Sequence, residues 1–242
     1  LGLKIEAQAT NLQRYGSDFA SWANKTQVSV SSSVAIAPNG LLEADLLVAN
    51  GSPTGHYLFD NAMSFTSGDI HTVSVYAKDA GQRYVQLNGS SVAFGSFKYA
   101  TFDLQTGSVD ANGGVTASAV SVGNGWYRIT ATMTSTSSGS GGMALTFANS
   151  ATSVRLPTFS GNNFDGVLCW GFQFETGSSA SSLVDTGSLN STISRASDSC
   201  SVADISSFYT GGPLTVVSET ETQVDENNRV IMNIDKNTSN RF

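Results

Sequence analysis

Charged residues are scarce in this chain, and the shortage narrows what it can bind. Only 13% of its 242 residues are Asp, Glu, Lys or Arg, about half of the level usual in soluble domains. The 12 basic residues are scattered singly and the formal net charge is −7, so the basic patch that holds nucleic acid is missing. We therefore expect no DNA or RNA partner. The composition is typical of extracellular β-proteins and of proteins built into large assemblies.

Cysteine and long apolar runs are also rare. The 2 cysteines, Cys169 and Cys200, are too few for a disulfide framework and lack metal-ligand spacing. Two buried free thiols are favoured, with a bridge as the open alternative. No apolar run approaches the roughly 18 residues of a membrane span, so no membrane insertion is expected. The N-terminus lacks a signal-peptide pattern, and we interpret Leu1 as the start of a fragment of a longer protein.

Short alternating runs, bounded by Gly, Asn, Asp and Ser, recur about every ten residues, while helical periodicity is nearly absent. This pattern, without an internal repeat, predicts an all-β fold, an antiparallel jelly-roll β-sandwich. Helical turns are expected only near Ser17–Ala23 and Ala203–Tyr209. The expected strands are Gln27–Ile36, Leu42–Ala49, Ile70–Lys78, Arg83–Asn88, Lys98–Leu104, Val115–Val122, Trp126–Thr134, Met143–Ala148 and Val167–Glu175.

The last of these runs shows the clearest alternation. We assign its apolar face to the core, so Trp170 is not expected to contact a ligand. After it, the Ser-rich stretch 177–191 is interpreted as an ordered strap or linker. One face of the run carries Leu168, Trp170, Phe172 and Phe174, and the other carries Cys169, Gln173 and Glu175.

The pattern divides the chain into two parts. Residues 1–198 contain the sandwich, and residues 199–242 contain a linker and the opening strands of a second, incomplete β domain, because alternation returns at Leu214–Glu219 and Val230–Asp235. Two strands cannot bury a core alone. This second part should therefore pair with the sandwich, with a partner chain, or with residues beyond Phe242.

A set of short motifs follows one another across residues 5–198. Each is weak alone, but their order and spacing are fairly specific. They are Ile5–Leu12 with Ser17–Phe19, Trp22, Ala37–Gly40, Val73–Lys78, Phe102–Gly107, Gly123–Arg128, Trp170–Glu175 and Ser194–Ala196. Together they resemble a module of tailed-bacteriophage virion proteins, especially tail fibres and other appendages.

The resemblance implies a jelly-roll sandwich similar to carbohydrate-binding modules, located in the virion on a protein that meets the host surface. It implies other virion proteins and cell-surface glycans as partners, and leaves the sugar open. It also implies that a laminin-G or concanavalin-like domain follows the sandwich. Residues 214–242 resemble the opening strands of such a domain. By analogy with fibres we expect a homo-oligomer, with a trimer as the first expectation.

Sugar binding requires aromatic faces for pyranose rings and planar polar groups for hydroxyls. If the alternating apolar residues face the core, such groups gather on the opposite faces of four strands. The alternative interpretation is that these aromatic residues cover an edge or pack under a loop, with Trp126 filling a corner. The candidates for carbohydrate binding are Tyr76, Tyr84, Gln86, Trp126, Arg128 and Gln173.

Catalysis and cofactors are not expected. His56 and His71 have no nucleophile or metal motif nearby. The carboxylate pairs Glu43 with Asp45, and Asp165 with Glu175, are better interpreted as solvated groups at turns than as a glycosidase pair. The resemblance to carbohydrate-binding modules implies one metal hypothesis, a structural calcium between the first and last strands, for which Glu6 and Glu175 are the candidate ligands.

The leading hypothesis is therefore a non-enzymatic structural protein of a tailed-phage virion, in a tail fibre, tail tip or other appendage, that attaches to host-surface glycans. One alternative is a purely architectural capsid or neck decoration protein. Another is an ancillary carbohydrate-binding module of a secreted bacterial polysaccharide hydrolase.

Overall fold

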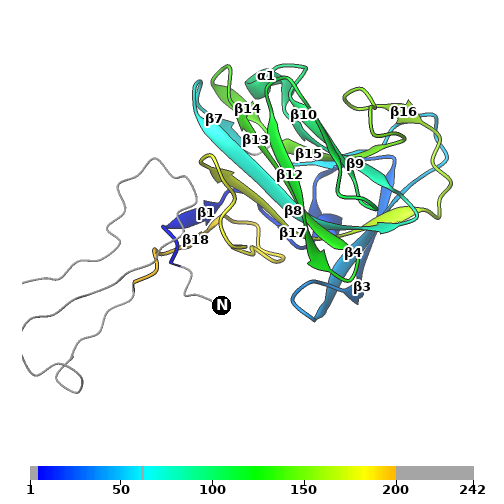
Figure 1. Cartoon of the computed structure of the whole chain (residues 1–242), viewed down its shortest axis with the longest axis horizontal. Coiled ribbons are helices and arrows are strands. Elements are labelled where there is room, and N and C mark those ends of the chain that lie inside the picture. Colours follow the sequence, from blue (N-terminus) through cyan, green and yellow to red (C-terminus); the bar gives the residue numbers. More distant parts are fainter. Residues whose placement is uncertain (1–4, 61–62, 200–242) are drawn as a thin grey trace, which may run out of the picture. The chain divides into compact units, whose positions relative to one another are not determined.

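The computed structural model of the protein describes residues 5–60 and 63–199. Its long strands form two six-stranded antiparallel sheets packed across one apolar core (Figure 1). The predicted all-β antiparallel sandwich is confirmed. It lies within the unit Leu1–Asp198. The expected second domain, with Cys200, the helical turn at 203–209 and the strands after 214, lies outside the described residues and stays a prediction.

We name each sheet after a central strand. The β9 sheet runs in the order β11 (Val109–Asn112), β10 (Tyr99–Asp103), β9 (Tyr84–Gly89), β15 (Met143–Ala148), β6 (Tyr57–Phe59) and β2 (Asn24–Thr26). The β8 sheet runs in the order β12 (Thr116–Gly123), β13 (Trp126–Thr134), β8 (Ile70–Ala80), β17 (Gly166–Thr176), β4 (Leu42–Ala49) and β3 (Val28–Ile36). Each of the expected strands is present in one of these two sheets.

The remaining elements are short. Three strand pairs lie outside the two sheets: β1 (Ala9–Asn11) with β18 (Ile193–Arg195), β5 (Thr54–Gly55) with β16 (Thr158–Phe159), and β7 (Met63–Phe65) with β14 (Gly139–Gly141). The helical turn expected near residues 17–23 is the 3-10 helix η1 (Phe19–Ser21), and one helical turn that was not expected is α1 (Ser91–Phe94). Strands of two to four residues are too short to show a period of two, which is why the sequence did not reveal them.

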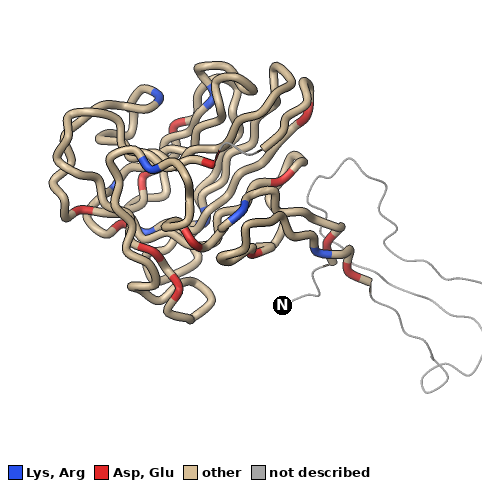
Figure 2. Tube along the Cα trace, turned by 180° about the vertical axis from the view of Figure 1, so that it is seen from behind, with Lys and Arg blue, Asp and Glu red and all other residues tan. Residues whose placement is uncertain are grey.

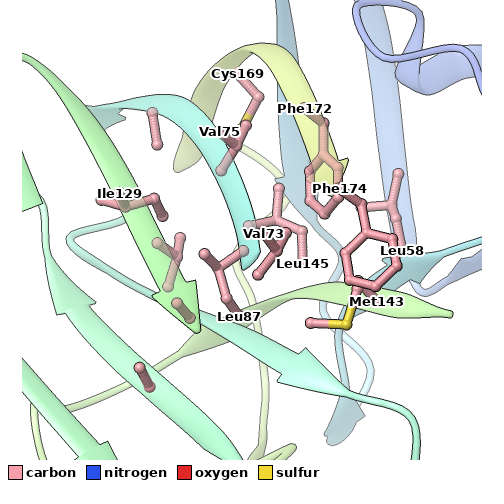
Figure 3. Packing of buried hydrophobic residues seen from close by; sticks show 14 of the residues in the cluster. Leu58, Val73, Val75, Leu87, Ile129, Met143, Leu145, Cys169, Phe172 and Phe174 are labelled. Atoms are coloured by element: carbon pink, nitrogen blue, oxygen red, sulfur yellow. The ribbon is translucent and has the colours of Figure 1, made fainter. Parts of the chain in front are cut away.

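The core follows the predicted alternation on most strands. Val73 and Val75 of β8 and Leu87 of β9 are fully buried, and Leu145 of β15 is nearly so. In Figure 3 these side chains point into a common cluster between the two sheets. Since burial of such a side chain stabilises the fold by about 1.5–3 kcal/mol, this alternation is sufficient to fix which face of each strand is inside.

Strand β17 departs from the prediction because it contains a β-bulge. Its pairing with β8 skips one residue between Trp170 and Gln173, and Gly171 has a φ of 63°. Because side chains alternate between the two faces of a strand, the extra residue places every residue before the bulge on the face opposite to the predicted one. Cys169 is therefore a free, buried thiol of the core, whereas Leu168 and Trp170 lie on the outer face. The prediction that Leu168 and Trp170 belong to the sandwich core is wrong. The prediction that Phe172 and Phe174 belong to it is confirmed.

The chain closes where its first and last described strands pair. Ala9 lies opposite Arg195, and the Arg195 guanidinium donates to a Glu6 carboxylate oxygen at 2.7 Å. The motif Ser194–Ala196 thus ties the exit of the sandwich to its entrance (Figure 1). No helix within residues 5–60 and 63–199 has the length and apolarity to cross a membrane.

Candidate functional site

The outward side chains of the β8 sheet form four rows that run across β13, β8 and β17. Two rows at one end are rich in aromatic and apolar groups, and two at the other end are polar. Because directly opposed residues in antiparallel strands lie within contact distance, each row is a continuous strip. The rows are Trp126–Lys78–Leu168, Arg128–Tyr76–Trp170, Thr130–Ser74–Gln173 and Thr132–Thr72–Glu175.

The polar half is covered by the strap, residues 177–191. The Gln173 side-chain amide donates to Ser181 Oγ at 3.1 Å and its oxygen accepts from the Val184 N–H at 2.6 Å. The Glu175 carboxylate accepts from the Ser181 hydroxyl at 2.6 Å and from the Ser181 N–H at 3.0 Å. Gln173 and Glu175 are 0% and 5% exposed. This half of the face therefore serves to hold the strap.

The aromatic half is a second apolar cluster, separate from the main core. Trp126 and Trp170 pack in it with Ala37 and Ala44, and the Tyr76 ring lies 5.2 Å from the Trp170 ring, centroid to centroid. Aromatic pairs at this separation attract each other. Tyr76 is half-buried, so this cluster reaches the surface.

Arg128 lies at the boundary of the two halves. Its guanidinium carbon is 5.5 Å from the centroid of the Tyr76 ring, a cation–π distance. Its Nη2 donates to the Ser181 carbonyl at 2.7 Å and to Ser74 Oγ at 3.0 Å. Arg128 therefore joins the aromatic cluster to the strap.

An open hollow of about 360 Å³ lies over the first of the four rows. Its volume is at the lower end of the range of small-molecule sites. The hollow is lined from opposite edges of the sheet, by the β3–β4 hairpin and by the β12–β13 turn, so both hairpins arch over the outer face. The lining residues are Ala35, Ile36, Ala37, Pro38, Gly40, Lys78, Val122, Gly123, Asn124, Trp126 and Leu168.

Four of the six sequence-predicted binding residues share this outer face. Trp126 lines the hollow, Tyr76 and Arg128 lie in the next row, and Gln173 lies under the strap. Alternation alone was enough to place Tyr76, Trp126 and Arg128 there. Trp126 is 4% exposed, so only a small part of its indole meets the hollow, and the corner-filling interpretation describes part of its role.

Tyr84 and Gln86 lie on β9, in the opposite sheet, and cannot line one surface with the other four. Alternation shows which face a residue takes but not which sheet its strand joins. The buried Gln86 amide donates to the Val154 carbonyl at 2.9 Å and accepts from the Leu156 N–H at 3.1 Å, so it positions a loop. Tyr84 lies under the guanidinium of Arg83, 5.1 Å from ring centroid to carbon.

The candidate calcium ligands are both used by the protein. Glu6 accepts from the Ser182 N–H at 2.9 Å and pairs with Arg195, and Glu175 binds Ser181 as described. In the part of the chain that the structure describes, no group of three or more His, Cys, Asp and Glu side chains is arranged to hold a metal. The two carboxylates accept hydrogen bonds from neighbouring residues of the strap. Calcium binding by Glu6 and Glu175 stays a prediction.

The acidic pairs considered for catalysis do not form a glycosidase arrangement. Asp165 precedes the eleven-residue strand β17 and Glu175 lies near its end, which separates them by about 30 Å, far beyond the spacing of a carboxylate pair. Burial raises the pKa of Asp45, opposed by N–H groups that Ser33 and Phe19 donate to it. Asp45 therefore fixes backbone rather than facing a substrate.

Sequence reasoning missed the walls of the hollow. Ile36, Val122, Lys78 and Leu168 were not candidates, since a strand pattern does not reveal that two hairpins bend over the same face. A signal was available, however. The turn motifs Ala37–Gly40 and Gly123–Arg128 both contribute residues to the lining.

Comparisons with known proteins found little. No protein-family model matches the chain, and no curated protein matches it. Among solved structures, the chain is similar to the C-terminal CBM6 of LamC, a marine laminarinase from Zobellia galactanivorans, with 12% identity and a TM-score of 0.33. The match covers 70% of this chain and 98% of that one. This is a distant likeness to a carbohydrate-binding module and adds nothing to the chemistry of the hollow.

Proposed function

We propose that this sandwich is a non-catalytic carbohydrate-binding module, and that the hollow over Trp126 is its glycan site. The observation that carries the proposal is the combination of apolar surface, from Leu168 and the accessible part of Trp126, with polar groups of Lys78 and Asn124 in one preformed hollow. A pyranose ring presents apolar C–H groups on its faces and hydroxyls at its edge, and needs both kinds of surface.

The outer face of the β8 sheet suits binding rather than catalysis. Its carboxylate, Glu175, is 5% exposed and bound by the strap, so this face directs no carboxylate at the hollow. Glycosidase chemistry needs a pair of carboxyl groups at the scissile bond. A sugar held there would be bound and released unchanged.

The glycan site can be tested without disturbing the core. Ile36 and Val122 line the hollow and are 57% and 44% exposed, so Ile36→Asp with Val122→Asp should leave the fold intact and repel a ring from the walls. The matched control is Val34→Asp with Val120→Asp, on the same strands at 49% and 59% exposure and outside the lining. On a glycan array, the first variant should lose the parent's binding and the second should keep it. Equal binding by both would remove the hollow as the site.

We further propose that the module belongs to a tail fibre, tail tip or similar appendage of a tailed-phage virion, where it forms a homo-oligomer, with a trimer as the first expectation, and contacts other virion proteins. The support is the order of motifs along residues 5–198. Several of them, Ala37–Gly40, Val73–Lys78 and Gly123–Arg128, meet at the hollow. Mass spectrometry of purified virions tests the location, and light scattering of the full chain tests the stoichiometry. If the gene that encodes this chain also encodes a catalytic domain, that would instead favour an ancillary module of a secreted polysaccharide hydrolase.

A purely architectural role in a virion is the second candidate, favoured by apolar side chains left exposed in loops, in turns and at the ends of strands. Phe97 and Phe164 are 77% and 82% exposed, and Leu41 and Leu42 are more than half exposed. Exposed apolar side chains of this kind are available for contacts with other proteins, and such contacts typically use a contiguous apolar patch. Binding of the full chain to other virion proteins, with no binding to any glycan, would favour this role.

A further inference from the structure

The charge of the hollow suggests which sugars it takes. Of the residues that line it, Lys78 is the one that carries a charge. It lies in the middle of the first row, between Trp126 on β13 and Leu168 on β17. Lys78 is partly buried there, and a partner usually offsets the hydration that a partly buried charge loses.

No partner from the protein offsets that loss. Within residues 5–60 and 63–199, Lys78 makes no hydrogen bond and no ion pair, while three arginines of the same region are paired with carboxylates. The adjacent Asp79 is directed elsewhere: one oxygen accepts from the Gly81 N–H at 2.7 Å and the other from Gln105 Nε2 at 2.7 Å.

This unpaired cation occurs in a chain where acidic residues outnumber basic ones, 19 to 12. Figure 2 shows that blue segments are few along the trace and scattered among the red ones. Counter-charges are thus available in the protein, yet none is placed at Lys78. Among the described residues, the lack of a partner at Lys78 is therefore not explained by a shortage of carboxylates.

The surroundings limit where the Lys78 side chain can lie and strengthen its attraction for an anion. A methyl group at Gly125 would lie 3.3 Å from Lys78 Cε, so the lysine stem runs along the β12–β13 turn. Ile36, Val122 and Leu168 surround the hollow with apolar atoms, and apolar surroundings strengthen the attraction between opposite charges. The Asn124 side chain supplies neutral hydrogen-bonding groups beside it.

We propose that the hollow binds an anionic sugar, one that carries a carboxylate or a sulfate, with the anion on the Lys78 ammonium and the ring over Trp126 and Leu168. This inference rests on the proposed glycan site and adds its charge class. Hydrogen bonds to charged groups are stronger than those between neutral groups, so an acidic sugar should bind at least about tenfold more tightly than its neutral counterpart.

The test uses the full chain and an array on which each acidic glycan is printed beside a neutral counterpart: uronic acid oligomers beside their methyl esters, and sulfated oligosaccharides beside the unsulfated ones. The variants are Lys78→Met and, as a control with the same change in net charge outside the hollow, Lys98→Met. The parent and Lys98→Met should prefer the acidic member of a pair by about tenfold or more, and Lys78→Met should bind both members equally. Added salt should reduce the preference.

The outcomes separate the two proposals. Preference for the uronic acids or for the sulfated sugars identifies the anion. Equal binding of acidic and neutral members by the parent, lost in Ile36→Asp with Val122→Asp, would overturn the anionic inference and keep the glycan site. Absence of binding to every glycan, or binding that survives the hollow variants, would overturn the glycan site itself.

Discussion

His71 shows how one residue sets a property of the whole domain. This residue is 2% exposed, and among the residues that the structure describes neither ring nitrogen has a hydrogen-bond partner. It stacks on Phe174 at 5.1 Å between centroids, and the edges of Phe65 and Phe94 complete the enclosure. Burial lowers its pKa below the ordinary value of 6.5, opposed by the charge of Asp69 and, more weakly, by the nearby backbone of Glu175. The folded protein therefore keeps this imidazole neutral.

We expect His71 to make the stability of the domain fall in mild acid. Below about pH 6.5 the His71 side chain binds a proton in the unfolded chain but not in the folded protein. The free energy of unfolding therefore decreases as the pH falls, until the pH reaches the lowered pKa of His71 in the folded protein. His71→Phe removes the titrating imidazole and puts an aromatic ring in its place, which suits an enclosure of phenylalanine rings. Urea denaturation between pH 7 and pH 5 should give a flatter profile for the variant than for the parent. Parallel profiles would show that His71 has no such role.

At the scale of the element, β17 decides which residues face the hollow. The bulge at Gly171 places Trp170 and Leu168 outside and Cys169 inside. The inserted stretch is also tied to the N-terminal segment, since the Phe172 N–H donates to the Gly16 carbonyl at 2.8 Å and the Gly171 N–H to Ser17 Oγ at 3.2 Å. One extra residue thus builds both the outer aromatic cluster and the contact that closes the sandwich.

Gly171→Ala should destabilise the domain by about 2 kcal/mol, because a side chain in the left-handed region costs about 1–2 kcal/mol and the new Cβ would lie 2.8 Å from Leu183 Cδ2. Gly68→Ala is the control: its φ is 93° and nothing lies within 4 Å of the added carbon. Thermal unfolding should therefore show a larger loss for Gly171→Ala than for Gly68→Ala. Equal losses would mean that the contact with Leu183 carries no cost.

The strands themselves were predictable, and this bulge was not. Trp126–Thr134 and Met143–Ala148 have in the structure the bounds that alternation gave them, because apolar residues alternate along each and a glycine-rich segment precedes it. The bulge leaves no trace in the alternation of Leu168, Trp170, Phe172 and Phe174, since an apolar residue stands at every second position on both sides of it. Only Gly171 hinted at it, among 24 glycines.

At the scale of the molecule, the candidate site depends on topology. Tyr76 and Tyr84 are eight residues apart in sequence, yet β8 and β9 belong to opposite sheets, so the predicted set divides between two faces. Conversely, Ile36 and Val122 come from strands at opposite edges of one sheet and meet at the hollow. Strand order and hairpin bending are non-local, which is why four of the predicted residues share the outer face and most of the lining was missed.

The central claim is that a glycan binds over Trp126, and the three tryptophans offer a direct measurement. The indole N–H of Trp22 donates to the Tyr15 carbonyl at 2.9 Å within the main core, whereas Trp126 lines the hollow. In a titration with the tightest-binding glycan, followed by the nuclear magnetic resonance signals of the indole N–H groups, the Trp126 signal should shift progressively and the Trp22 signal should stay in place. A glycan that binds and leaves the Trp126 signal unmoved would contradict the claim.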